Sequence, residues 1–157
     1  GQGDLLVTTL QLLNFIASIA NGGKIYKPHL APQEPESLFN YSDWQEEIKE
    51  VQQGMIDAVQ KPYGTASLLS FLPVSAAGKT GSAQVANNTR TNAFFVGYAP
   101  AYAEASAGKQ EDPPAGGPQI ALLVLIENAR EGSLNAVPIA KDVLEWYYYN
   151  RLAKTNH

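Results

Sequence analysis

The stretch "SAAGKTGSAQV", residues 75–85, contains a lysine, two hydroxyl side chains and two glycines within positions 78–82. This combination is typical of a phosphate-binding loop or of a strand that borders a ligand cleft. The phosphate-loop pattern Gly-x-x-x-x-Gly-Lys-Ser/Thr places its first glycine at position 73, which is Pro73, and no helix start follows Lys79. The sequence therefore favours a strand whose lysine points into a cleft, whose hydroxyls can meet a carboxylate and whose glycines let another backbone approach.

Two later segments also have the composition of strands. Residues 92–98, "NAFFVGY", are aromatic and apolar, and residues 120–126, "IALLVLI", form an unbroken apolar run that is typical of a strand covered on both faces. With a glycine-interrupted strand at 74–85, they predict an antiparallel three-strand meander, because short or flexible links join them. The link at 99–119 is rich in Ala, Gly and Pro and is predicted to be a mobile surface excursion.

Apolar residues at helical spacing predict three helices, at residues 8–20, 43–60 and 138–152. Thr8 with Gln11 and Ser42 with Gln45 fit the capping boxes of the first two helices. Pro138 suits the first turn of the last one. The chain is therefore predicted to be an α+β protein, with helices packed on an antiparallel sheet.

Two other segments carry weaker signals. Residues 24–40 contain three prolines and no clean period, which predicts an extended crossing followed by a loop. The run "WYYY" at 146–149 places aromatic rings most of the way round one helical turn. Packing against a sheet is the favoured interpretation of this run, and a ligand-stacking role is the alternative.

Composition narrows the classes of function. The 157 residues are 45% hydrophobic, which is enough for one domain with a real core. The net charge of −4 and the scattered positions of the 11 basic residues argue against a nucleic-acid surface. The absence of cysteine excludes disulfides, and His29 and His157 lack the acidic spacing of a metal site. We therefore expect neither a metal nor a cofactor.

The beginning of the chain points to a missing segment. No stretch approaches the roughly 20 apolar residues that span a bilayer, and no signal-peptide pattern is present at the start. The chain begins Gly-Gln-Gly, without a methionine, and continues directly into a helix pattern. We therefore expect that an upstream segment, with any anchor it carries, is absent.

Lys79-Thr80-Gly81-Ser82 resembles the Lys-Thr-Gly motif of penicillin-binding proteins and serine β-lactamases. Other segments resemble landmarks of the class B penicillin-binding proteins in the expected order, and "NGGKIYKPHL" is closer to the elongation type, like penicillin-binding protein 2. These segments are "GQGDLLVTTLQLLNFIASIANGGKIYKPHL" (1–30), "YGTA" (63–66), "AGKTGSAQV" (77–85), "AFFVGYAP" (93–100) and "AVPIAKDVLEWYY" (136–148). Two departures are mild: Thr9 stands where the family usually has proline, and Ser82 where threonine is common.

The resemblance implies that residues 1–157 are the C-terminal portion of a transpeptidase domain with a penicillin-binding/serine β-lactamase-like fold. It implies a peptidoglycan D,D-transpeptidase that works through an acyl-serine intermediate, binds stem peptides and β-lactam antibiotics, and needs the rest of its domain as a partner. It also implies a location on the extracytoplasmic (periplasmic) face of the bacterial cell membrane, held by an N-terminal segment that this chain lacks.

The family's Ser-x-x-Lys and Ser-x-Asn motifs belong upstream of Lys-Thr-Gly, and the chain begins after both. Two matches to these patterns, Ser106 to Lys109 and Ser133 to Asn135, lie downstream of Lys79 and are interpreted as decoys. The first of them also sits in a Pro/Gly/Ala loop, where no helix holds its lysine one turn from its serine. The chain alone is therefore expected neither to hydrolyse D-Ala-D-Ala nor to be acylated by penicillin.

The resemblance assigns roles to four positions. Lys79 is expected near the nucleophile, where its charge supports the carboxylate pocket and the proton network. The hydroxyls of Thr80 and Ser82 are expected to bind the terminal carboxylate, and the Ser82 backbone N–H to supply one oxyanion donor. Gly81 is expected to keep the strand flat beside the substrate. Gly97 and Tyr98, on the neighbouring strand, are expected to support the motif strand, which forms one wall of the ligand cleft.

Three further points stay open at the level of sequence. An oxacillinase-like β-lactamase or β-lactam sensor shares Lys-Thr-Gly, and a non-catalytic binding module could keep the same fold. The resemblance also implies that "IALLVLI" is central in the complete five-stranded sheet. In this chain it is therefore expected to expose an unpaired apolar edge and to allow dimerisation or strand swapping.

Overall fold

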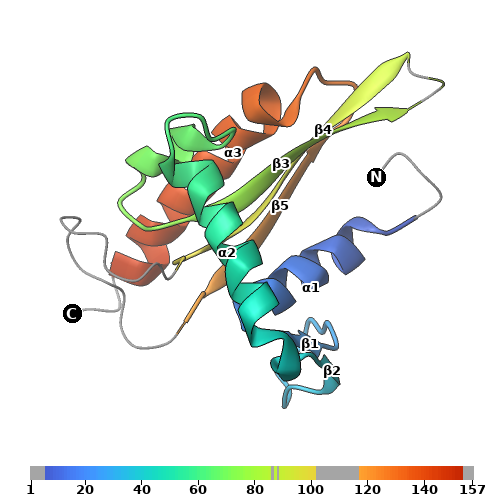
Figure 1. Ribbon diagram of the computed structural model, residues 1–157, viewed down its shortest axis with the longest axis vertical. Coiled ribbons are helices and arrows are strands. Elements are labelled where there is room, and N and C mark those ends of the chain that lie inside the picture. Colours follow the sequence, from blue (N-terminus) through green and yellow to red (C-terminus); the bar gives the residue numbers. More distant parts are fainter. Residues whose placement is uncertain (1–5, 86, 88, 102–116, 154–157) are drawn as a thin grey trace.

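The computed structural model describes residues 6–85, 87, 89–101 and 117–153. In chain order the elements are α1 (Thr9–Ala20), β1 (Lys24–Tyr26), β2 (Ser37–Asn40), the 3₁₀ turn η1 (Ser42–Trp44), α2 (Gln45–Gln60), the 3₁₀ turn η2 (Ser67–Phe71), β3 (Ala77–Val85), β4 (Arg90–Ala99), β5 (Ile120–Ile126), α3 (Gly132–Tyr147) and the π-helical turn η3 (Tyr148–Leu152). The strands β3, β4 and β5 form one three-stranded sheet, and Figure 1 shows helices on both of its faces.

The predicted antiparallel meander is confirmed. The strand order is β3-β4-β5, and both pairs are antiparallel. Strand β5 spans the seven residues predicted for it, whereas β3 begins three residues later than predicted. Most of the link predicted to be a mobile excursion, residues 102–116, lies outside the described residues.

The alternation of side chains along the strands creates two separate cores. Phe95 and Val124 face α3 and pack with Ala136, Val137 and other apolar residues. Val96 and Tyr98 face the opposite way and pack with residues of α1 and α2. In Figure 1, α1 and α2 accordingly cross the near face of the sheet, while α3 lies behind it. Both faces of β5 are covered, as its apolar run predicted, although Val124 is the one residue of this strand that is buried and the other six are partly buried.

The ends of α1 form as the sequence predicts. The Gln11 N–H donates to Thr8 Oγ1 at 3.2 Å, and the Thr8 N–H donates to Gln11 Oε1 at 2.9 Å, so the capping box is complete. Gly22 and Gly23 follow with φ of +84° and +106°. Only glycine adopts such angles without strain, and the chain therefore leaves the helix at this point.

The start of α2 differs from the prediction. A 3₁₀ turn occupies 42–44, α2 begins at Gln45, and no side chain caps it. Gln45 does not close a capping box with Ser42, because its Nε2 donates to the carbonyl of Gly22 at 2.7 Å. The glutamine satisfies an exposed carbonyl at the end of α1, a partner that the local sequence does not reveal.

Residues 24–40, predicted as an extended crossing followed by a loop, are in part a hairpin. β1 and β2 pair antiparallel, with Lys24 opposite Asn40 and Ile25 opposite Phe39. Lys27 Nζ and Glu36 Oε2, 2.9 Å apart, connect the strands near the open end of the loop. Strands this short are recognised by their partners and not by their own period, so the prediction of a loop was wrong at 37–40, whereas β1 agrees with the predicted extended crossing.

Helix α3 begins at Gly132, six residues before the predicted start at Pro138. The Asn135 Oδ1 accepts the backbone N–H groups of Arg130 and Glu131, at 3.0 and 3.2 Å, and so fixes the earlier start. Pro138 lies inside the helix, although a proline there removes one backbone hydrogen bond. The preference of proline for a first turn was therefore a misleading signal.

The aromatic run at the end of α3 agrees only partly with the prediction of packing. Tyr147 and Tyr148 pack against the core on the α3 side of the sheet. Trp146 and Tyr149 keep 57% and 55% of their surface exposed. Two of the four aromatic residues therefore pack against the core, and the other two lie mainly at the surface.

Burial raises the pKa of Tyr98 on β4 to about 12. The unfolded chain has a tyrosine pKa near 10, so the neutral side chain contributes stability below about pH 10 that is lost as the pH rises through 12. An ultraviolet titration should contain a tyrosine that ionises near pH 12, and Tyr98→Phe should remove this step. Tyr98→Phe should reduce the loss of stability in this alkaline range, and an unchanged loss would contradict the assignment.

Candidate active site

Lys79, Thr80, Gly81 and Ser82 lie in the middle of β3 as extended backbone, opposite Val96, Phe95, Phe94 and Ala93 of β4. β3 is an edge of the three-stranded sheet, and no strand among the described residues pairs with its other side. Lys79 and Ser82 are exposed, and Thr80 and Gly81 are half-buried. The predicted strand is therefore extended and accessible from solvent, as a ligand-binding strand must be.

Lys79 lies on the face of the sheet that α1 and α2 cover. Its register partner Val96 belongs to the core on this face, and residues directly opposite in a ladder share a face. The Lys79 Nζ donates to the backbone carbonyl of Thr80 at 2.7 Å. The ammonium group thus stays beside the strand, on an exposed side chain.

The Thr80 hydroxyl has a protein partner that the motif does not reveal. Thr80 Oγ1 donates to Thr65 Oγ1 at 2.8 Å, across 15 residues of sequence. The pair joins the motif strand to the turn that follows α2. Thr65 belongs to the family landmark "YGTA", and this pattern does not predict which side chain Thr65 contacts.

The turn that carries Thr65 is held firmly on both sides. The Gly64 N–H donates to the Lys61 carbonyl and the Ala66 N–H to the Ala58 carbonyl, both at 2.9 Å. Gly64 packs so tightly against the Ala58 carbonyl that a side chain there has no room. Ala66 is fully buried, whereas Thr65 is exposed. Thr65 is therefore a solvent-facing hydroxyl on a rigid support.

Ser82 connects the motif to the start of α3. Its Oγ accepts the backbone N–H of Gly132 at 3.3 Å. A Cβ on Gly132 would lie 2.8 Å from the Gly81 carbonyl oxygen and closer still to that of Phe94. The first turn of α3 therefore rests directly on β3 and β4 behind the motif.

The two decoy matches stand apart from this arrangement. Ser106 to Lys109 lies outside the described residues. Ser133 and Asn135 belong to the first turn of α3, where Ser133 Oγ donates to Glu131 Oε1 at 3.1 Å and Asn135 Oδ1 accepts the backbone N–H of Glu131 at 3.2 Å. Tyr98 is 2% exposed, which agrees with a supporting role for it in the wall.

Comparison with known proteins decides the family. The family model of the penicillin binding protein transpeptidase domain matches residues 1–108. The chain belongs to this family. The predicted resemblance to penicillin-binding proteins is therefore confirmed, and so is the α+β fold with its antiparallel sheet.

Individual relatives point to penicillin-binding protein 2. The peptidoglycan D,D-transpeptidase MrdA of Acinetobacter baumannii is 29% identical over 176 residues, which cover 96% of this chain and 24% of the relative. The structure of Pseudomonas aeruginosa PBP2 in complex with WCK 5153 is 32% identical with a TM-score of 0.75, and the match covers 96% of this chain and 32% of that one. The structure of Helicobacter pylori PBP2 in complex with MreC is 28% identical with a TM-score of 0.73. This match covers 97% of the present chain and 26% of the H. pylori chain.

This transpeptidase-family chain is similar to only a part of those proteins. It spans about a quarter of the length of the curated relative from A. baumannii. The likeness to PBP2 supports the predicted elongation type. The roles assigned to residues 79–82 stay predictions.

Proposed function

We propose that the chain is the C-terminal portion of a peptidoglycan D,D-transpeptidase domain that cross-links stem peptides through an acyl-serine intermediate. The observation that carries the proposal is the Lys-Thr-Gly-Ser sequence on an exposed, extended edge strand of a chain that belongs to the transpeptidase family. The name of its curated relative, a D,D-transpeptidase, favours this activity over that of a β-lactamase or of a binding module.

In this proposal β3 binds the end of the stem peptide. The hydroxyls of Thr80 and Ser82, on the α3 face of β3, hydrogen-bond the terminal carboxylate, and the Lys79 ammonium, on the opposite face, attracts it across the open edge of the strand. The Ser82 backbone N–H is one of two donors to the oxyanion, a contribution of about 3 kcal/mol to the stability of the transition state. Gly81 has no side chain, so the peptide backbone can lie directly alongside the strand at this position. The nucleophilic serine comes from a part of the domain outside this chain.

A titration of the chain itself tests the carboxylate site. We expect N-acetyl-D-Ala-D-Ala to shift the backbone NMR signals of residues 79–82 with millimolar affinity. Its methyl ester, which lacks the charge, should bind more weakly. Equal shifts with acid and ester, or no shifts in β3, would contradict the proposal. Because the nucleophile is absent, mixing the chain with penicillin should leave its mass unchanged, and a covalent adduct would contradict this part.

When a carboxylate accepts the Thr80 proton, we expect the Thr65 hydroxyl to rotate and donate to Thr80 Oγ1, so that Thr65 orients the Thr80 hydroxyl toward the carboxylate. Thr65→Val removes the 2.8 Å hydrogen bond and should weaken the binding of N-acetyl-D-Ala-D-Ala about fivefold, since a hydrogen bond contributes about 1 kcal/mol. Thr65→Ser keeps the hydroxyl and serves as the matched control, with affinity close to wild type. A purely structural role predicts that the acid and its methyl ester lose affinity equally.

We also propose that β5 pairs with a strand outside the described part of this chain. Its seven residues are all apolar, yet six of them are only partly buried, and β4 is its one partner among the described strands. In the complete protein the rest of the domain would cover this edge. The isolated chain should dimerise through it, and a monomer by light scattering at high concentration would contradict that expectation.

Location and partners follow from the same proposal. We propose the periplasmic face of the bacterial membrane, with β-lactams as inhibitors and the stem peptide as substrate. A protein partner is also expected, since the H. pylori relative was solved in complex with MreC. The helices in the described ranges are all too short or too polar to span a membrane.

A further inference from the structure

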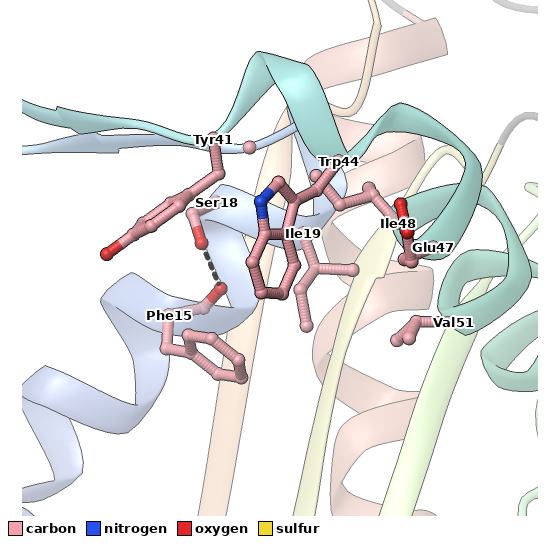
Figure 2. A pocket seen from close by; sticks show the side chains of 9 residues that line it. Phe15, Ser18, Ile19, Tyr41, Trp44, Glu47, Ile48 and Val51 are labelled. Carbon is pink, nitrogen blue, oxygen red and sulfur yellow. Dashed lines mark hydrogen bonds between the residues drawn. The ribbon is translucent and has the colours of Figure 1, made fainter.

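An open groove lies between α1, the β1–β2 hairpin and the start of α2, away from the motif strand. It has a volume of about 310 Å³ and is lined mainly by Phe15, Ile19, Tyr41, Trp44, Ile48 and Val51. Figure 2 shows Trp44 over Ile19, between Tyr41 and Val51, with Phe15 below. The volume is at the lower end of ligand sites, which suits a few bulky side chains.

The rim of the groove is unusually apolar for a surface. Trp44 and Phe15 expose 61% and 54% of their surface, and Val51 and Tyr41 expose 47% and 44%. The row continues to Phe39, which stacks on Tyr41 with ring centroids 6.3 Å apart. Contiguous exposed aromatic side chains mark interaction sites, and Trp and Tyr dominate the binding energy of protein interfaces.

Hydrogen bonds between the three elements preform the groove. Gln52 Nε2 donates to the Ile19 carbonyl at 2.7 Å and thereby ties α2 to α1. The Tyr41 N–H donates to the Gly23 carbonyl at 2.8 Å. A Cβ on Gly23 would lie only 2.8 Å from the Ile48 side chain, so the floor is closely packed. A preformed site binds with little ordering cost.

One side of the groove is acidic. Glu47 lines it, Glu50 lies one turn further along α2, and Asp43 precedes them in η1. None of these three carboxylates takes part in an ion pair with another described residue. Lys49 lies two positions from Glu47, on another face of the helix. Lys24, in the hairpin, is the nearest basic residue in sequence to the groove-lining Gly23.

We propose that this groove docks a basic amphipathic helix of a partner protein. One or two bulky apolar side chains of the partner would enter between Phe15 and Trp44, and its Lys or Arg residues would face Glu47 and Glu50. Apolar anchors with charged flanks are the usual way in which a helix binds a groove. An anionic membrane surface fits less well, because the three carboxylates would be repelled by it.

The test uses two synthetic helical peptides that share a Leu/Phe face and carry either Lys or Glu on the other face. Binding is followed by the anisotropy of a dye on the peptide. We expect the Lys peptide to bind with saturation and the Glu peptide to bind at least about tenfold more weakly, a difference of about 1.4 kcal/mol. Trp44→Ala should abolish binding of the Lys peptide.

Charge reversal provides the matched control. Glu47→Lys should weaken binding of the Lys peptide about tenfold and strengthen binding of the Glu peptide, whereas Glu46→Lys, outside the groove lining, should change neither. Thermal unfolding of each variant checks that the fold is kept. Equal effects of the two reversals would overturn the proposal. Tighter binding to anionic vesicles than to the Lys peptide, or self-association that Trp44→Ala abolishes, would assign the groove to a membrane or to a second copy and overturn it too.

Discussion

Gly132→Ala is expected to destabilise the chain by about 3 kcal/mol or more, although it adds a single methyl group. The new Cβ would lie 2.8 Å from the Gly81 carbonyl oxygen, 3.0 Å from the Gly81 nitrogen and closer still to the Phe94 carbonyl oxygen. All three atoms are backbone atoms of paired strands, so no flexible side chain can move aside. The start of α3 must therefore shift away from the sheet. The measurement is the denaturant midpoint followed by circular dichroism.

Gly54 offers the matched control for this substitution. It lies within α2, and a Cβ there would meet nothing within 4 Å. Because alanine is a better helix former than glycine, Gly54→Ala should stabilise the chain by up to about 1 kcal/mol. The two substitutions are chemically identical and are expected to have opposite signs. Equal shifts of the denaturant midpoint would show that α3 does not rest on the strands as closely as its backbone indicates.

Gly132→Ala should also disturb the candidate site. The Gly132 N–H donates to Ser82 Oγ at 3.3 Å, and a displaced helix start would lose this bond. Under conditions in which the Gly132→Ala variant stays folded, its affinity for N-acetyl-D-Ala-D-Ala should be lower than that of the wild type. The packing behind the motif and the binding in front of it are thus coupled through Ser82.

The sequence predicted those elements that local signals determine. β5 was predicted with its observed ends because its apolar run is unbroken. The start of α1 was predicted because Thr8 and Gln11 cap one another within a single turn. The hairpin was missed, since β1 and β2 are three and four residues long and are recognisable only by their pairing. Pro138 misplaced the start of α3, because a tolerated internal proline has the same sequence signal as a first-turn proline.

The candidate site shows the same limit. Lys79 to Ser82 were identified because their chemistry and family pattern occupy adjacent positions. Thr65 and Gly132 were missed as neighbours of this motif, since they lie 15 and 50 residues from their partners in it. A motif predicts which groups face a ligand, whereas the support behind them depends on the packing of distant segments.

Lys79→Met should have the largest effect on activity in the complete transpeptidase of which we propose that this chain is a part. Methionine keeps the length of the side chain and removes the charge that the proposal places beside the carboxylate and the proton network. Groups that act in proton transfer contribute about a hundred- to ten-thousandfold to rate, so acylation by a fluorescent penicillin should slow by a factor in this range. Because Lys79 is exposed on β3, the thermal stability should change little.

Lys141→Met is the control for this loss of charge. Lys141 lies on α3, not on the motif strand, and its Nζ forms an ion pair with Glu145 Oε2 at 3.2 Å. Its replacement removes an equal charge from the protein, so the acylation rate should stay near wild type. If both variants slowed equally, the effect would come from net charge and not from the position of Lys79. If Lys79→Met reacted at the wild-type rate, the ammonium would have no part in acylation, and β3 would serve only to hold the peptide.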